Sequence, residues 1–469
     1  MPDIPIPLVG PSNEGVHPKA DCQRTINLFP VRAEAEGEKA RWHLQGAPGL
    51  STLVTLSFTK TRGFYVFEGR LFVVANAWLI EVYSNGTTYS WGSIGSVRGK
   101  VTMAELNGVI VIGDGAGFYS FTVATGVIAV ITQAPIGRHC IAFNQRILYV
   151  QRGTGRVYYS ALNNATSINS LDFFTAENRP DDLLTGLATE DQVWLFGEGT
   201  IEVWYDSGDA DNPFQRIPGG VIHAGILSED TALRADNSLW WVEKDDQGQG
   251  IVRRSHGFTP VRVSTAAVER FTASATDLSA FSYQEQGRIF VILNADEGTW
   301  AYDVKEQLWH ERAWTNPADG DFERARPELH AFAYGFHLVS DHTSGKIYKQ
   351  SLDYYDHAGD PMVSRRITAH TDAEGRALTV HEFYVDCAVG VGLITGQGSD
   401  PQMMLRYSVD GGLTWSNELH RDMGEIGKYL TRARWHSLGL GRDWAFEVSI
   451  SDPIPRILAG ARARMSVGR

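Results

Sequence analysis

Two groups of acidic side chains have a spacing that metal binding or acid–base chemistry could use. Asp206, Asp209 and Asp211 fall in one polar stretch that could hold calcium, because calcium binds several carboxylate oxygens. The ligand spacing and the terminal glutamate of an EF-hand loop are missing, so a solvated acidic loop is the favoured interpretation.

The second acidic group contains Glu177, Asp181 and Asp182. Two such carboxylates could act as general acid and general base, but that chemistry needs a pocket and shifted pKa values. The sequence indicates neither, and we expect a turn between strands at this position.

Histidines and glycines give no firmer catalytic signal. The 14 histidines form no H-E-x-x-H or other zinc pattern, and we expect His310 and His330 to be packing or surface residues. The chain has no G-x-S-x-G elbow and no P-loop Gly-Lys-Ser/Thr. The glycine-rich run 113–117 lies between two expected strands, whereas a phosphate-binding loop needs a following helix. The sequence therefore predicts no catalytic residue, no cofactor and no metal site.

One short motif has a defined local geometry. Ser408, Asp410, Gly412, Thr414 and Trp415 match the S-x-D-x-G-x-T-W pattern of the Asp-box hairpin, which occurs in sialidases and other repeat proteins. The serine and aspartate side chains can bond backbone amides across a tight glycine turn, and the tryptophan packs beneath it. We expect a structural hairpin rather than a sialidase remnant, because the motif occurs once and outside the repeats described below.

The composition is that of a folded soluble protein with an acidic surface. The chain has 469 residues, 43% of them hydrophobic, and a net charge of −13. No lysine- or arginine-rich block stands out, which argues against nucleic-acid coating and membrane-surface binding. No apolar stretch is long enough to cross a bilayer, and the N-terminus does not resemble a signal peptide. Three widely spaced cysteines are expected to be free thiols in a reducing cytosol, namely Cys22, Cys140 and Cys387.

A unit of short strands recurs seven times between residues 62 and 367. In each copy a polar turn precedes an apolar strand, and the first apolar residues of these strands are Leu71, Val109, Ile147, Val193, Leu239, Ile289 and Leu338. Their spacings are 38, 38, 46, 46, 50 and 49 residues. A repeat of this length built from strands alone is typical of a β-propeller. The expected fold is all-β, with seven blades favoured and six possible.

The propeller is expected at 61–368, between an N-terminal arm at 1–60 and a C-terminal β domain at 369–469. The arm should contain short strands near 26–31 and 50–56, and it either closes the propeller ring or reaches a neighbour. Within the propeller we expect the most exposed loop at 205–220 and a short helix at 264–271.

The C-terminal region is expected to form a small antiparallel β-sandwich. Its strand candidates are 382–389, 403–408, 435–438 and 444–450. The remaining residues, 457–469, are expected to form a basic tail carrying Arg462, Arg464 and Arg469.

Five stretches carry a resemblance to a known family. They are ADCQRTINLFPVRAEAEGEKARWHLQGAPGL (20–50), DFFTAENRPDD (172–182), LFGEGTIEVWY (195–205), TWAYDVKEQLWHE (299–311) and GEIGKYLTRARWHSLGLGRDWAFEV (424–448). In this order they resemble the packaged-DNA stabilisation proteins of short-tailed bacteriophages, also called tail hub or nozzle proteins. The resemblance covers nearly the whole chain.

The resemblance implies a structural role in the virion tail, after synthesis in the host bacterial cytoplasm. Proteins of this family are similar in forming a ring, usually a hexamer, below the portal and its adaptor ring. The implied partners are other copies of the chain, the portal adaptor protein, a tail fibre or tailspike, a tail needle or plug, and packaged DNA bound without sequence specificity. Membrane insertion is not implied. An acidic channel lining would repel DNA phosphates and let DNA slide.

Two other classes remain open. A glycan-active, sialidase-like propeller enzyme would need clustered arginines and a Tyr–Glu pair converging on the propeller axis, which these spacings do not assemble. A cellular propeller scaffold is the other alternative. Neighbouring portal and terminase genes would favour the virion role over both.

Overall fold

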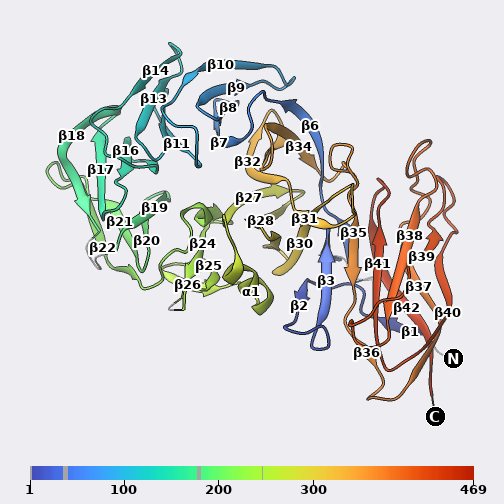
Figure 1. The fold of residues 1–469 in the computed structure, drawn as a ribbon. Coiled ribbons are helices and arrows are strands. Elements are labelled where there is room, and N and C mark those ends of the chain that lie inside the picture. The colour runs from blue at the N-terminus through green and yellow to red at the C-terminus, as the bar shows by residue number, and fades with distance from the viewer. Residues whose placement is uncertain (1–2, 35–40, 177–180, 246, 469) are drawn as a thin grey trace.

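The computed structural model describes residues 3–34, 41–176, 181–245 and 247–468 and is almost entirely β. Seven four-stranded antiparallel arrays surround an axis, and a two-sheet domain lies beside them (Figure 1). The first strand of each array lies nearest the axis, and the first strands of most neighbouring arrays contact one another. The expected fold is confirmed as a propeller of seven blades, not six, followed by a β-sandwich.

Each of the first six blades takes four consecutive strands. The first three blades contain β7 (Thr61–Phe67), β8 (Arg70–Ala75), β9 (Trp78–Val82) and β10 (Thr88–Ser93); β11 (Thr102–Leu106), β12 (Val109–Gly113), β13 (Phe118–Thr122) and β14 (Val127–Val130); and β15 (Cys140–Phe143), β16 (Arg146–Val150), β17 (Arg156–Ala161) and β18 (Asn164–Thr175). The next three contain β19 (Leu183–Ala188), β20 (Val193–Gly197), β21 (Ile201–Asp206) and β22 (Phe214–Ile222); β23 (Leu233–Ala235), β24 (Ser238–Lys244), β25 (Gly250–His256) and β26 (Thr259–Arg262); and β27 (Ser279–Glu285), β28 (Arg288–Ala295), β29 (Gly298–Asp303) and β30 (Leu308–Thr315).

Two-residue turns set the register of the inner hairpins. Glu68–Gly69, Asn107–Gly108 and Gln286–Gly287 all have positive φ angles, between 49° and 78°, as tight hairpin turns of the primed types require. The strands after these turns are covered on both faces by neighbouring blades, and residues 71–75 of β8 are fully buried. This explains why they are continuous apolar runs rather than alternating ones.

The N-terminal arm closes the propeller ring. The seventh blade contains β32 (Pro327–Ala333), β33 (Phe336–Asp341) and β34 (Lys346–Ser351), and its outermost strand is β6 (Gly49–Thr55) from the arm. At the start of β6, a Cβ on Gly49 would lie 2.5 Å from the carbonyl oxygen of Asp356. The sequence left ring closure and contact with a neighbour open, and the structure assigns β6 to closure.

The sixth blade continues into the sandwich as one sheet. Its outer strand β30 pairs with β3 (Cys22–Ile26), which pairs with β35 (Ser364–Ile367), which pairs with β41 (Asp443–Ile450) of the sandwich. Short strands flank this path, namely β2 (Asn13–Glu14), β31 (Phe322–Arg324) and β36 (Thr371–Asp372). The domain boundaries at 60 and 368 stay predictions, because strands of the arm join sheets on both sides.

Arg366 fixes the arm at this junction. Its guanidinium is fully buried and donates to the carbonyl oxygens of Leu8 (2.6 Å) and Pro11 (2.9 Å), to Thr25 Oγ1 (2.8 Å) and to Gln23 Oε1 (2.8 Å). Burial lowers the pKa of Arg366 to about 9. These donations satisfy the charge without a carboxylate contact and hold residues 8–25 against β35.

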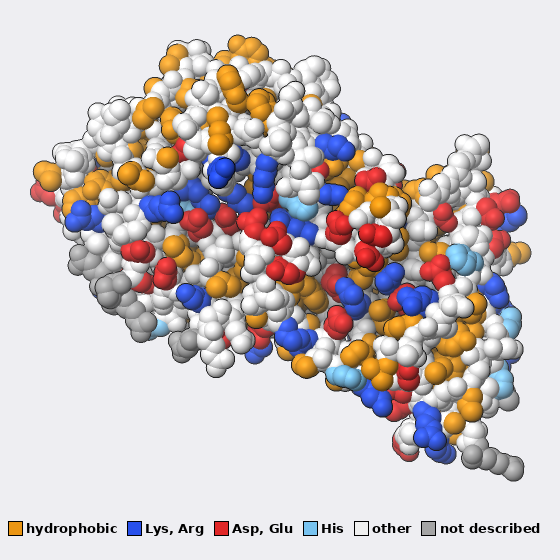
Figure 2. Space-filling model, in the orientation of Figure 1, with side chains coloured by type: hydrophobic (Ala, Val, Ile, Leu, Met, Phe, Trp, Pro, Cys, Tyr) orange, Lys and Arg blue, Asp and Glu red, His pale blue; other side chains and the backbone are white. Residues whose placement is uncertain are grey.

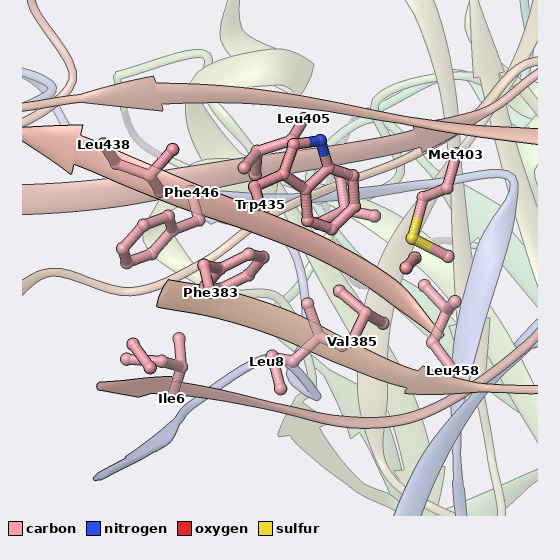
Figure 3. Packing of buried hydrophobic residues seen from close by; sticks show 14 of the residues in the cluster. Ile6, Leu8, Phe383, Val385, Met403, Leu405, Trp435, Leu438, Phe446 and Leu458 are labelled. Carbon is pink, nitrogen blue, oxygen red and sulfur yellow. The ribbon is translucent and has the colours of Figure 1, made fainter. Parts of the chain in front are cut away.

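The sandwich packs two sheets around one apolar core. One sheet contains β1 (Asp3–Ile6), β4 (Leu28–Arg32), β5 (Trp42–Gly46), β37 (Leu378–Cys387), β40 (Ala433–Gly441) and β42 (Ile457–Val467), and the other adds β38 (Gln402–Ser408) and β39 (Leu419–Asp422) to β35 and β41. Figure 3 shows Phe383, Trp435 and Phe446 in contact between the sheets, with Ile6 and Leu8 of the arm beneath them. The rings of Phe383 and Phe446 stack with centroids 4.4 Å apart.

The prediction of a basic tail after residue 456 is wrong. Residues 457–467 form β42, which pairs with β37 on one side and with β1 and β5 on the other. Leu458, Ala461, Ala463 and Met465 face the core, so the arginines between them project outward. The segment forms a strand because alternate side chains, including the small alanines, pack inward while the arginines between them face outward.

The predicted loop at 205–220 is also too long. Strand β21 extends to Asp206 and β22 begins at Phe214, so the connection is only 207–213. Phe214 is buried and stacks on Phe174 of the preceding blade at 5.0 Å, which draws the second half of the segment into the blade. The helix expected at 264–271 is present as α1 (Ala266–Ser274), after the one-turn helix η1 (Glu229–Thr231).

Candidate functional site

Charged side chains gather over the middle of the propeller, where Figure 2 shows a band of basic residues beside acidic ones. They come mainly from loops that connect the outer strand of one blade to the inner strand of the next. Seven such loops converge on one end of the axis in a propeller, so residues far apart in sequence meet there.

Lys100 connects three parts of the ring across this end. Its Nζ lies 3.2 Å from Glu328 Oε1 in the seventh blade and 3.7 Å from Asp230 Oδ2, which follows the fourth blade. Lys60 and Arg324 also approach Glu328, at 3.7 Å and 3.9 Å, although Glu328 is only 3% exposed. A buried carboxylate is tolerated here because three cations surround it.

The third blade adds a second set of contacts. Arg138 pairs with Asp230 and, at 3.0 Å, with Glu229, while His139 Nε2 lies 2.8 Å from Glu229 Oε2. Burial lowers the pKa of His139, although its hydrogen bond to Glu229 acts in the opposite direction. We call Lys60, Lys100, Arg138, His139, Glu229, Asp230, Arg324 and Glu328 the axial ion network. It ties five connections between blades together across the axis.

A cavity of about 630 Å³ lies beside this network. Both signs of charge line it, with the basic residues Arg98, Lys100, Arg138 and Arg152 and the acidic residues Asp114, Asp182, Glu198 and Glu229. None of the described residues lining it is a tyrosine, so a sialidase-like arginine cluster with a Tyr–Glu pair is not assembled there. The geometry is that of a charge-balanced contact between blades.

The Asp-box residues form a closed hairpin at the end of β38. Asp410 Oδ1 accepts from the backbone N–H groups of Leu413 (3.1 Å) and Thr414 (2.9 Å), and its Oδ2 accepts from Thr414 Oγ1 (2.6 Å). Ser408 Oγ accepts from the N–H of Gly412 at 2.8 Å. Hydrogen bonding, chiefly from the Thr414 hydroxyl, lowers the pKa of Asp410 to about 2.

The hairpin packs against the N-terminal arm. Trp415 lies against a small buried group formed by Cys22, Ile367 and Ala445, and a Cβ on Gly412 would lie 3.1 Å from Cys22 Cβ. These contacts fit a positioning element between arm and sandwich. Its purely structural role stays a prediction.

The acidic candidates remain apart from any catalytic arrangement. Asp206, Asp209 and Asp211 lie at the tip between β21 and β22, where Asp209 accepts from the N–H groups of Asp211 and Asn212. Asp181 accepts from the N–H groups of Gly199 and Thr200. Glu177 lies outside the described residues. Within the described part of the chain, no group of three or more His, Cys, Asp or Glu side chains could hold a metal ion.

The other candidates have packing roles. Burial lowers the pKa of His310, well below its usual range, and that of His330, to about 3. The run 113–117 is a strand–turn–strand segment in which Asp114 accepts from the N–H groups of Ala116 and Gly117. Cys22 and Cys140 are buried, Cys387 is half-buried, and all three are free thiols. No described helix is long and apolar enough to cross a membrane.

Sequence reasoning missed Arg366 and the axial ion network. The network draws on residues 60 to 328, and charge alone gives no signal that they meet. Their positions just before inner strands were the one available signal, because these positions converge once the fold is a propeller.

The comparison with protein families identifies the family that has this architecture. Residues 14–354 match the family described as Bacteriophage P22 Gp10, beta-propeller, and residues 364–466 match the family described as Bacteriophage P22 Gp10, beta-sandwich. The chain belongs to the bacteriophage P22 Gp10 family. This is the tail hub or nozzle family of short-tailed phages, so the chain is a structural protein of the phage tail.

Several solved structures are similar to part of the chain at low sequence identity. Virginiamycin B lyase from Staphylococcus aureus is 12% identical, with a TM-score of 0.44 over 65% of this chain and 99% of that chain. The extracellular domain of a putative hybrid two component system from B. thetaiotaomicron is 10% identical, with a TM-score of 0.45; the match covers 65% of this chain and 39% of that chain. The Neurospora crassa Pan2 WD40 domain is 8% identical, with a TM-score of 0.42 over 64% and 94%. No curated protein matches the chain.

Proposed function

We propose that this chain assembles as a ring of six copies in the phage tail, below the portal and its adaptor ring. The ring retains the packaged DNA and attaches tail fibres or tailspikes and the tail needle or plug. The observation that carries the proposal is the family match over both domains in their expected order.

The rigidity of the molecule supports this role. The sheet that runs from the sixth blade through β3 and β35 into β41 joins propeller and sandwich without a flexible linker. An elongated rigid subunit has surfaces at both ends, so each copy in a ring can present two different faces to its neighbours. The net charge of −13 supports a channel along which DNA slides without binding.

The chain acts by binding rather than by catalysis. Purified protein is expected to show no turnover of sialosides, cell-wall glycans or nucleic acid. A measured activity that disappears when one carboxylate lining the cavity beside the axial ion network is replaced, for example Glu198→Gln, would overturn this part of the proposal.

The decisive experiment is a phage that lacks this chain. Its particles should package DNA, then lose it, and should carry neither fibres or spikes nor the needle. Supplying the chain from a plasmid should restore all of these properties. Particles that keep their DNA and every other tail component without the chain would refute the assignment.

A further inference from the structure

A groove of about 1110 Å³ lies on the sandwich. It lies between the arm segment 5–9, the ends of β37 and β42, and the loop 424–432. We call it the sandwich groove, and six of its lining residues matter below, namely Arg41, Trp42, Tyr384, Tyr429, Arg432 and Arg462.

Among the described residues that line the sandwich groove, arginines outnumber carboxylates. Arg41, Arg432 and Arg462 are exposed and form no ion pair with a described residue, whereas the neighbouring Arg434 and Arg464 both pair with Glu382. One acid, Asp386, also lines the groove and has an interaction of its own. On a protein with a net charge of −13, such a site attracts an anionic partner.

Apolar side chains form one wall of the same groove. Leu430 is 98% exposed and Tyr429 is 71% exposed, next to each other in the loop 424–432. Large apolar side chains this exposed, beside unpaired arginines, are typical of an interface that a partner covers. The partner should therefore carry both carboxylates and apolar groups.

The tip of the fourth blade supplies the carboxylates. The segment 206–212, which we call the acidic loop, presents Asp209 and Asp211 to solvent and contains no basic residue. Its turns hold it in one shape, because Asp206 accepts from the N–H of Gly208 and Asp209 accepts from the N–H of Asp211. A preformed loop loses little conformational entropy on docking.

The blade before the acidic loop carries an exposed apolar residue. Leu171 of β18 is 78% exposed and precedes Asp172 in sequence. Three residues further along β18, Phe174 stacks on Phe214, which directly follows the tip of the fourth blade in β22. The third and fourth blades, which are neighbours, thus carry an exposed apolar side chain and exposed carboxylates.

The acidic loop and the sandwich groove lie at opposite ends of the molecule (Figure 1). One copy therefore cannot fill its own groove, but successive copies can do so head to tail. We propose that the acidic loop of each copy docks into the sandwich groove of the next copy, and that this contact closes the ring. The inference rests on the proposed function, and heterologous contacts form a closed ring when the rotation between successive copies closes.

Charge reversal tests the contact in phage particles. A phage lacking the chain is complemented with Asp209→Arg/Asp211→Arg in the acidic loop, with Arg432→Glu/Arg462→Glu in the groove, or with all four changes in one chain. Copies of the chain per particle are counted by quantitative mass spectrometry of purified virions. The matched control is Asp319→Arg/Asp321→Arg, the same charge change in another exposed loop.

Each reversal alone should lower incorporation on the order of tenfold or more, because close interfacial charge pairs couple strongly. The fourfold variant should restore incorporation, since opposite charges again face one another, and the control should incorporate normally. Thermal unfolding of each purified variant identifies a folding defect, and the fourfold variant carries every change, so rescue excludes misfolding as the cause.

Three outcomes overturn the inference, and they separate it from the proposed function. Normal incorporation of either single reversal, or failure of the fourfold variant to rescue, refutes the docking contact while wild-type particles still contain the ring and retain DNA. Absence of the wild-type chain from virions refutes the proposed function and the contact together.

Discussion

Replacing Asp410 by alanine tests the Asp-box hairpin directly. The carboxylate accepts three hydrogen bonds from Leu413 and Thr414, at 2.6–3.1 Å, and a fourth from Ser408 Oγ at 2.7 Å. Asp410→Ala removes all four acceptor contacts and leaves two backbone N–H groups of the turn to water. The hairpin should loosen, while the strands that flank it keep their pairing.

The pKa of Asp410 sets an upper limit on the stability that Asp410→Ala should lose. A fall from 3.8 to about 2 corresponds to at most about 2.4 kcal/mol of stabilisation of the charged form. The residue is partly exposed at the surface, and solvent screens the interaction, so we expect a cost of roughly 1 kcal/mol. For a chain of this size that is a fall in Tm of roughly 1–3 °C.

The sign of the pH dependence follows from the lowered pKa. The stabilisation is fully present above pH 3.8, the ordinary pKa, and is lost as the pH falls toward about 2. Differential scanning calorimetry of wild type and Asp410→Asn at pH 7 and pH 2.5 should therefore give a Tm difference that shrinks at the lower pH. Asp400→Ala, an exposed aspartate of the same domain, is the control.

Particles assembled with Asp410→Ala should remain infectious, because the role predicted for the hairpin is structural. An unchanged Tm at pH 7 together with lost infectivity would refute this reasoning. It would show that the carboxylate acts on a partner rather than on its own turn.

Three further perturbations test the parts of the fold that hold the ring and the arm. Glu328→Ala leaves the cations of the axial ion network without their buried partner, and the urea midpoint should fall by the equivalent of roughly 3–5 kcal/mol; an unchanged midpoint would contradict a structural network. In Gly113→Ala the new Cβ would lie 1.9 Å from the Arg138 carbonyl oxygen, so we expect a loss of about 1–3 kcal/mol, whereas Gly117→Ala, with open space around its Cβ, should be neutral in the same titration. Arg366→Met leaves buried acceptors unpaired, costs about 3 kcal/mol, and should speed amide hydrogen exchange in residues 8–25; exchange at the wild-type rate would count against the anchoring role.

The blades could be predicted because their signals are local. A turn such as Asn107–Gly108 and the apolar strand after it lie within ten residues, so periodicity and turn chemistry are enough. The same holds for the Asp-box hairpin, whose hydrogen bonds stay within residues 408–414.

Strand β42 was missed for a physical reason. Its inward positions include Ala461 and Ala463, which bury little apolar area and give weak alternation, while Arg462 and Arg464 between them dominate the sequence pattern. The strand is stabilised mainly by pairing with β37, more than 70 residues away in the chain. Sequence reasoning that relies on local hydrophobicity undervalues such a strand.

Long-range pairing explains the features that could not be predicted from the sequence. The arm strand β6 pairs with β34, and nothing near residues 49–55 identifies a partner almost 300 residues away. The axial ion network is of the same kind, because Lys100 and Glu328 meet only after the ring closes. The fold class could thus be inferred from repeats, but the site required the closed structure.

The pairing of the first strands with the last ones also fixes when this chain can finish folding. Thr55 and Lys346 are 291 residues apart and pair at the end of the seventh blade. At protein synthesis rates of roughly 5–20 residues per second, β6 waits roughly 15–60 s for its partner. Strand β1 waits longer still, because Asp3 pairs with Arg464 in β42 on the sandwich (Figure 1). A chain whose translation stops early therefore keeps an open blade or an open sandwich, so only completed chains have both domains closed when they reach an assembling tail.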